Sequence, residues 1–276
     1  MKFDVDRFSS LNHRLDTSDM DFGVFKEEPL PAPVLRCLRY MHDVEHHSVC
    51  YLRDLLVTRA HRDSDITTFL TIWNYEEHWH GEAIGQVLAA HGELANGHRV
   101  ASLRRRLGVR DQMRPMLTQL TSMLTGHVVA LHMSWGAVNE WTTQAGYARL
   151  AERAGHPVLS ELLRRIMRQE GRHIDFYMSE ADKRLGGSAS AQCLTRAMLS
   201  RFWAPVGSGI MPRDDLRFLV MYLFAGPDGL VSAQRIDRRI SALPGLGGLT
   251  LVRQAVERLA LDRDDRDDDL AVTVQC

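Results

Sequence analysis

The sequence predicts an all-α protein: a four-helix bundle with a long crossover between its helix pairs and additional C-terminal helices. Apolar residues recur at steps of three and four over long stretches, as on one face of a helix. No β-rich stretch or Gly-rich phosphate loop interrupts them, and two Glu-x-x-His pairs fall on the apolar faces. At 276 residues and 45% hydrophobic, the chain can build one substantial core.

Proline, glycine and charge positions divide the chain into four regions. Residues 1–33 hold three prolines and no sustained period, which predicts an N-terminal arm lying over the bundle. The bundle is expected over 34–187. Shorter helices packed on it are expected over 188–262. The charge run Asp262 to Asp269 predicts a flexible acidic tail at 263–276.

The first helix pair is expected at about 34–58 and 64–91. In the first helix, Glu45 lies in the middle of an apolar stripe that includes Leu38 and Leu52. In the second helix, Glu77 and His80 occupy the inner face, where core residues belong. Cap candidates precede the second helix at 63–65, and Gly92 follows it.

Residues 92–115 break the pattern with three glycines and Pro115, and predict a crossover between the helix pairs. The third helix is expected at about 116–154, with Glu140 on its inner face, and Gly155-His156-Pro157 ends it. The fourth is expected at about 157–185, with Glu170 and His173 facing inward.

Two similar halves repeat a ligand pattern. Glu45 precedes Glu77-x-x-His80 by 32 residues, and Glu140 precedes Glu170-x-x-His173 by 30. Residues three apart share a helix face. Four unpaired carboxylates at one depth need cations, and two divalent ions would balance them. An oxygen-rich set with an imidazole at either end suits iron or manganese better than zinc or copper. The alternative is that these residues lie on solvated faces by coincidence. The predicted metal ligands are Glu45, Glu77, His80, Glu140, Glu170 and His173.

Histidines outside the repeat include His46, His47, His78, His127 and His132. We expect them to be surface residues or hydrogen-bonded core residues. Four scattered cysteines lack CxxC spacing and predict reduced thiols in a cytoplasmic protein. No signal peptide and no apolar run long enough to span a membrane is apparent in the sequence.

Three segments resemble motifs of the soluble acyl-acyl-carrier-protein desaturases, which are ferritin-like diiron proteins. Residues 73–81 resemble the family's segment W-x-x-E-E-x-x-H-G. Residues 140–143 look like its E-x-x-T helix, and residues 168–173 like its E-x-R-H helix. The resemblance covers about residues 34–186 and is closer to bacterial than to plant-type members, because the chain is short.

The resemblance implies a ferritin-like fold and two iron ions, with manganese possible at one site and Glu77 and Glu170 as bridges. It implies an O2-dependent diiron oxidase that introduces a double bond into a carrier-bound fatty acyl chain. Thr143 would donate a proton during O2 activation; the alternative is a backbone hydrogen bond within its helix. The implied partners are an acyl carrier protein, a ferredoxin-type electron donor and a second copy in a homodimer.

One residue departs from the desaturase pattern, and others separate this chain from related dimetal proteins. Gln169 stands where the desaturases place an acid beside a ligating histidine. Ile84 occupies the position of the radical tyrosine of ribonucleotide reductase small subunits and cannot form that radical. Gln144 occupies the position of a threonine in bacterial multicomponent hydroxylases, so Thr143 favours the desaturases over that class. Storage proteins of this kind end near the fourth helix. A diiron oxygenase that hydroxylates or N-oxygenates a specialised metabolite remains an alternative, as does non-catalytic metal binding.

The net charge of -1 predicts no bulk attraction to nucleic acid. Local arginine clusters provide candidate docking sites for an acidic carrier protein, unless they only solubilise exposed helix faces. Gly136 and Ala137 leave room for an alkyl chain or permit close helix packing. The candidate docking arginines are Arg104, Arg105, Arg106, Arg164, Arg165, Arg168 and Arg172.

Overall fold

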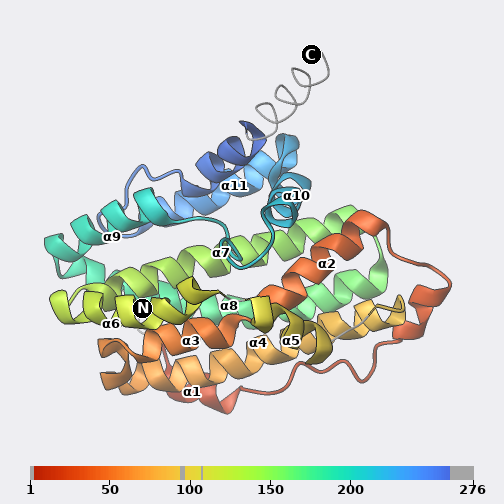
Figure 1. The fold of residues 1–276 in the computed structure, drawn as a ribbon, viewed down its shortest axis with the longest axis horizontal. Helices are drawn as coiled ribbons and strands as arrows, with labels where there is room; N and C mark the ends of the chain where they lie inside the picture. Colours follow the sequence, from red (N-terminus) through yellow and green to blue (C-terminus); the bar gives the residue numbers. More distant parts are fainter. Residues whose placement is uncertain (1–2, 94–96, 107, 262–276) are drawn as a thin grey trace.

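The computed structural model describes residues 3–93, 97–106 and 108–261, and every regular element within these ranges is a helix (Figure 1). The all-α prediction is confirmed. A further helix spans residues 251–261. The other elements are, in chain order, α1 (Val5–Ser10), the 3-10 helix η1 (Phe22–Lys26), α2 (Ala32–Glu45), α3 (Ser48–Leu56), the 3-10 helix η2 (Arg59–Arg62), α4 (Ser64–Ala90), α5 (Gly97–Arg106), α6 (Val109–Leu124), α7 (Val128–Ala154), α8 (Pro157–Gly186), α9 (Ala189–Phe202), α10 (Arg213–Phe224) and α11 (Gly226–Ala242).

Two helix pairs form the bundle. Helix α2 packs along α4, α7 packs along α8, and contacts between α4 and α8 join the two pairs. Helices α5 and α6 form the crossover between the pairs. Helices α9, α10 and α11 lie against α7 as a further layer (Figure 1). The faces that carry Glu45, Glu77, Glu140 and Glu170 therefore meet inside the bundle.

Local signals set the ends of the long helices. The Asp63 side chain accepts hydrogen bonds from two backbone N–H groups in the first turn of α4. Helix α7 ends at Gly155, whose φ of 61° lies in the left-handed region that favours glycine. Pro157 then begins α8, where its missing N–H is not needed. These signals lie within a few residues of each boundary, so the sequence predicts the boundaries well.

The first predicted helix, at 34–58, is interrupted. Helix α2 ends at Glu45 and α3 begins at Ser48. Between them His47 donates to the Val44 carbonyl at 2.9 Å, three residues back, so the regular α-helical bonding pattern stops here. Neither glycine nor proline marks this position, and the sequence therefore gave no local signal. The break makes Glu45 the last residue of α2, and its side chain is buried in the bundle.

The third predicted helix, at 116–154, is two helices. Thr125 adopts an extended conformation with φ -140° and ψ 135°, and Gly126 follows it before α7 begins. Apolar periodicity continues on both sides, which hid the break, although Gly126 was an available signal. The crossover is consequently helical. Its second helix, α6, has side chains that are more than half exposed: Met116, Leu117, Leu120, Met123 and Leu124.

The N-terminal segment lies along the bundle. Both α1 and η1 contact α4. The ring of Phe8 lies 5.4 Å from that of Phe69, and the ring of Phe3 lies 5.3 Å from that of Phe176. These aromatic contacts cover one end of the α4–α8 contact. The predicted acidic tail at 263–276 lies outside the described residues.

No disulfide links Cys37, Cys50 and Cys193, the three cysteines within the described ranges. In the same part of the chain, no single helix has the length and apolar character needed to cross a membrane. Helices α10 and α11 meet that test only jointly, and they bend by 96° where they join.

Candidate metal centre

The six predicted ligands converge in the middle of the bundle, and all six are buried. They form two overlapping groups, and the donor atoms of each group lie within 4.8 Å of one another. Glu77 and Glu170 belong to both groups. The first group is Glu45, Glu77, His80 and Glu170; the second is Glu77, Glu140, Glu170 and His173. This is the arrangement of two neighbouring cation sites that share two carboxylates.

The Nδ1 atoms of both histidines face the carboxylates. His80 Nδ1 lies 3.3 Å from Glu170 Oε1 and 3.9 Å from Glu45 Oε2. His173 Nδ1 lies 3.1 Å from Glu170 Oε2 and 3.2 Å from Glu77 Oε1. Donor atoms that bind one ion at about 2.0–2.2 Å lie roughly 3–4 Å apart. The spacing of the donors therefore fits bound ions with little rearrangement.

Four buried atoms of this cluster have no hydrogen-bond partner among the described residues: Glu45 Oε2, Glu77 Oε1, His80 Nδ1 and Glu170 Oε1. Buried polar atoms in native proteins are almost always paired. Because all four belong to the two cation groups, bound metal ions would satisfy them together. The donor set and these unpaired atoms both fit a dinuclear metal centre.

The electrostatics of the cluster also indicate cations. Burial raises the pKa of Glu45, and burial together with neighbouring carboxylates raises the pKa of Glu77 and Glu140 well above 4.5. Burial also acts to raise the pKa of Glu170, but contacts with His173 and His80 outweigh burial and lower that pKa. The raised pKa values favour the protonated forms of Glu45, Glu77 and Glu140, so metal binding should release protons.

The Nε2 atom of each histidine is held by the residue that precedes the shared glutamate of the opposite helix pair. His173 Nε2 lies 2.8 Å from Glu76 Oε2, and His80 Nε2 lies 2.8 Å from Gln169 Oε1. Arg172 donates to the other oxygen of Glu76 at 2.6 Å. These contacts orient both rings with Nδ1 toward the carboxylates.

Glu76 was not among the residues predicted to belong to the metal centre. Burial acts to raise its pKa, but contacts with His173 and Arg172 outweigh burial and lower it, so Glu76 is a carboxylate. The signal was present in the repeat, because Glu76 directly precedes Glu77 as Gln169 precedes Glu170. The repeated unit is thus one residue longer than Glu-x-x-His.

The two glutamates that are not shared are each held by an aromatic donor. Trp73 Nε1 donates to Glu140 Oε1 at 3.0 Å, and the Tyr147 hydroxyl donates to Glu45 Oε1. A buried N–H or O–H donor fixes the orientation of each carboxylate. Neither role was predicted from the sequence.

A cavity of about 500 Å³ opens beside the carboxylates. Glu45, Glu77, Glu140 and Thr143 form its inner wall. The Thr142 hydroxyl, rather than that of Thr143, donates to the carbonyl four residues earlier, Val138 O, at 2.7 Å. The rest of the lining is mainly apolar and aromatic, with Tyr51, Trp73, Leu117, Leu131, Trp135, Phe202 and Val206 among its residues.

Gly136 also lines the cavity, but its role is close packing. A Cβ atom at this position would lie 2.4 Å from the ring of Tyr177. Of the two interpretations that the sequence left open for Gly136, this distance favours close packing, because the space above Gly136 is filled by the tyrosine.

The predicted docking arginines of α8 are engaged by acids. Arg164 pairs with Glu161, Arg168 lies 3.7 Å from Glu161, and Arg165 binds Asp19 at 2.6 Å. Arg172 serves the metal centre through Glu76, as described above. The side chain of Arg106 is not among the described ones.

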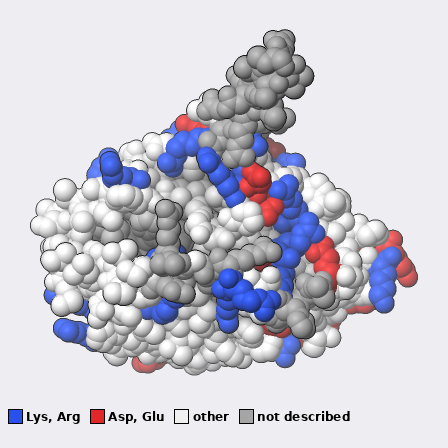
Figure 2. Space-filling view, viewed as in Figure 1, with Lys and Arg blue, Asp and Glu red and all other residues white. Residues whose placement is uncertain are grey.

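Arg104 and Arg105, by contrast, are exposed on α5. Figure 2 shows Lys and Arg gathered near α5, whereas the surface over α6 and α9 is largely uncharged. Of the predicted docking residues, this pair alone is both described and exposed without an acidic partner among the ion pairs found.

No protein-family model matches this chain, and no curated protein matches its sequence. Among solved structures, it is similar to two variants of an R2-like ligand-binding oxidase. One, with an aerobically reconstituted Mn/Fe cofactor, has a TM-score of 0.53 and 16% identity, over 92% of this chain and 89% of that one. The other, reconstituted anaerobically, has a TM-score of 0.53 and 15% identity, over 93% and 90%. The shared feature is a ferritin-like helical bundle.

Proposed function

We propose that this chain is an O2-dependent oxidase with a dinuclear iron or manganese–iron centre. The observation that supports it best is the pair of ligand groups that share Glu77 and Glu170 and face a largely apolar cavity. Bound iron or manganese would supply the electrons that reduce O2. The Mn/Fe cofactor of the structurally similar oxidases supports manganese at one of the two positions.

In this proposal, one set of residues binds the metal ions and a second set orients the ligands. Glu77 and Glu170 would hold both ions, and each histidine would hold one ion through Nδ1. Trp73 and Tyr147 fix the outer glutamates, while Glu76 and Gln169 fix the histidine rings. Because these contacts fix the orientation of the ligands, little reorganisation should accompany ion binding.

The cavity selects the substrate. Its volume falls in the range of about 300–1,000 Å³ that is usual for small-molecule sites, and its aromatic wall excludes water from the reacting atoms. We propose that a fatty acyl chain loses two hydrogens to give a double bond. These hydrogens, together with two electrons from a donor and two protons, would reduce one O2 to two water molecules. Thr143, on the wall one turn after Glu140, supplies a proton to the O2 being reduced.

We propose two protein partners, an electron donor and a carrier of the acyl chain. A ferredoxin-type protein would supply the electrons. An acyl carrier protein, which is acidic, would dock on Arg104 and Arg105 and stay outside while the acyl chain enters. Charge reversal at both arginines should raise the apparent KM for the carrier-bound substrate in a salt-sensitive way and leave the metal content normal. Equal activity on free acids would contradict carrier docking.

A second candidate function is oxygenation of a specialised metabolite. Polar residues on the cavity wall, including Ser48, His132 and Asn139, favour it, because a plain alkyl chain needs no polar contacts. The products separate the two functions: desaturation removes two hydrogens, whereas hydroxylation or N-oxygenation adds one oxygen atom.

The test is reconstitution followed by product analysis. Protein loaded with Fe2+, or with Mn2+ and Fe2+, should consume O2 after reduction, and mass spectrometry with a panel of acyl carriers should detect the product. Glu170→Ala is the matched control without the centre. Tightly bound zinc alone in the purified protein, or no O2 consumption by the fully loaded protein, would overturn the proposal.

A further inference from the structure

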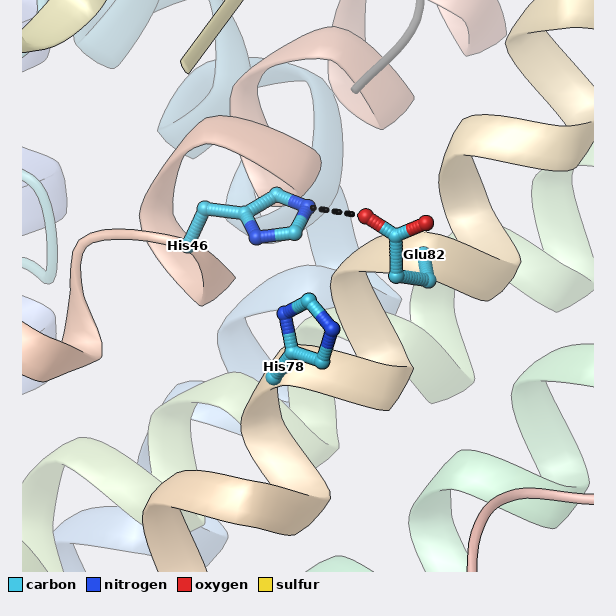
Figure 3. Close-up of side chains that lie close together, drawn as sticks. All are labelled: His46, His78 and Glu82. Atoms are coloured by element: carbon cyan, nitrogen blue, oxygen red, sulfur yellow. Dashed lines mark ion pairs between the residues drawn. The ribbon is translucent and has the colours of Figure 1, made fainter. Parts of the chain in front are cut away.

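A third group of metal-binding side chains lies outside the dinuclear centre. It contains His46, at the break between α2 and α3, and His78 and Glu82, one turn apart on α4 (Figure 3). Their donor atoms lie within 4.8 Å of one another, and His46 Nε2 is 3.6 Å from Glu82 Oε1. His78 is exposed and Glu82 is half-buried, so solvent reaches this group.

The backbone around the group is shaped to bring His46 onto α4. A Cβ atom at residue 81 would lie 2.7 Å from His46 Nε2, so the glycine there lets the imidazole ring lie against the helix between His78 and Glu82. The break after Glu45 directs His46 to this side, and the ring of His42 packs on it with centroids 4.6 Å apart.

His46 has an unused donor atom at this position. The residue is only 8% exposed, yet its Nε2 makes no hydrogen bond within the described ranges, because 3.6 Å to Glu82 is beyond hydrogen-bond distance. A buried nitrogen without a partner is unusual. A metal ion bound at His46 Nε2 would satisfy this nitrogen.

We propose that His46, His78 and Glu82 bind a third divalent transition-metal ion, separate from the dinuclear centre. Two imidazoles and one carboxylate suit Zn2+ or Fe2+, and the exposed side leaves positions for water. Ligands of one ion lie roughly 3–4 Å apart, so side-chain rotations at His78 and Glu82 are enough to close the site.

The ligands of the two sites alternate along the chain. Glu45 and Glu77 point into the bundle, and the residues that follow them, His46 and His78, meet on its outside. An ion at the outer site ties the break after α2 to α4. Since a ligand that binds only the folded protein stabilises it, binding should raise the Tm.

The test uses the full chain with iron already in the dinuclear centre, and Zn2+ as the probe. The wild-type protein should bind one further Zn2+ per chain with a rise in Tm. His78→Ala and Glu82→Gln should weaken that binding by more than about tenfold, since even loss of an outer-sphere partner of a metal costs that much. Both variants should keep their iron. His61→Ala, which removes an exposed histidine elsewhere, should bind Zn2+ like the wild type.

Three results would overturn the outer site: no Zn2+ bound beyond the iron, unchanged affinity in both variants, or equal loss in His61→Ala. The readout does not depend on oxidase activity. A protein that binds Zn2+ at His78 and Glu82 but consumes no O2 would support this site and contradict the proposed function, and the reverse outcome is equally distinguishable.

Discussion

The two halves of the dinuclear centre have the same ligands but different surroundings. On one side, His173 is held by the Glu76 carboxylate, which Arg172 also contacts. On the other side, His80 is held by the Gln169 amide, whose N–H group donates to a main-chain carbonyl at residue 13. A carboxylate makes the imidazole it holds more basic, whereas an amide orients the ring without adding charge.

This difference distinguishes two metal positions that the ligand repeat makes look equivalent. An ion beside His173 would meet a more basic imidazole than an ion beside His80. We expect the position beside His173 to bind its ion more tightly. Such asymmetry would suit two different metals.

Removing a shared ligand should have the largest effect on metal content. It should empty both metal positions, so that no difference between them remains. Glu170→Ala should lose both ions, because Glu170 belongs to both ligand groups. Elemental analysis of the purified variant measures this, with circular dichroism to check that it remains helical. Glu152→Ala, which changes an exposed glutamate, is the control. Full metal occupancy in Glu170→Ala would contradict the assignment.

Removing the charge on one side should affect one ion. Glu76→Gln should weaken binding of the ion beside His173 by about 10–100-fold, the usual cost of losing an outer-sphere partner. The ion beside His80 should change much less. A competition titration with a chelator, following both ions, measures the two affinities. Equal weakening of both ions would show that Glu76 acts on the whole fold rather than on His173.

The pH dependence of stability should separate the metal-free protein from the loaded one. Raised folded-state pKa values of Glu45, Glu77 and Glu140 mean that the folded, metal-free protein keeps protons that the unfolded chain releases. Stability should therefore fall as pH rises above the ordinary glutamate value of 4.5. His80 and His173, whose pKa values are also raised because contacts with Glu170 outweigh burial, act in the same direction.

Thermal unfolding across a pH series measures this effect. Metal-free protein should lose Tm as pH increases, whereas loaded protein should not, because ions replace the protons and bind better as the ligands deprotonate. A metal-free protein whose Tm rises over the same range would contradict protonated carboxylates in the core.

Making the two halves alike should have a smaller effect. Gln169→Glu should strengthen binding of the ion beside His80, but by less than about tenfold, below the usual range for an outer-sphere partner. The gain is limited because the new carboxylate would face the main-chain carbonyl at residue 13 and has no counterpart of Arg172. The same chelator titration measures it. A loss of affinity would show that repulsion outweighs the added basicity.

The smallest effect on metal content is expected at Thr143. Thr143→Val should keep both ions and lower the product formed per O2 consumed, since the variant removes only a hydroxyl at the cavity wall. Thr142→Val is the matched control, because the Thr142 hydroxyl bonds within its own helix. Unchanged coupling in Thr143→Val would leave Thr143 without a role in proton supply.

Features that depend on neighbouring residues in the chain were predictable. The period of apolar residues gave the helices at 64–91 and 157–185, and the i, i+3 spacing placed Glu77 with His80 and Glu170 with His173. The structure brings these residues together with Glu45 and Glu140, as the repeat suggested. The breaks near His46 and Gly126 were missed, because apolar periodicity continues across both.

The sequence by itself determined which helices form and which side chains are buried on them, because both follow from contacts within one or two turns. Only the tertiary structure decided how the antiparallel pairs register, and so which residue holds which histidine. That register sets Glu76 against His173 and Gln169 against His80. It also places the His46 ring, at the end of α2, against Gly81 on α4. Such pairings depend on the packing distance and rotation between helices, which no local pattern in the chain encodes.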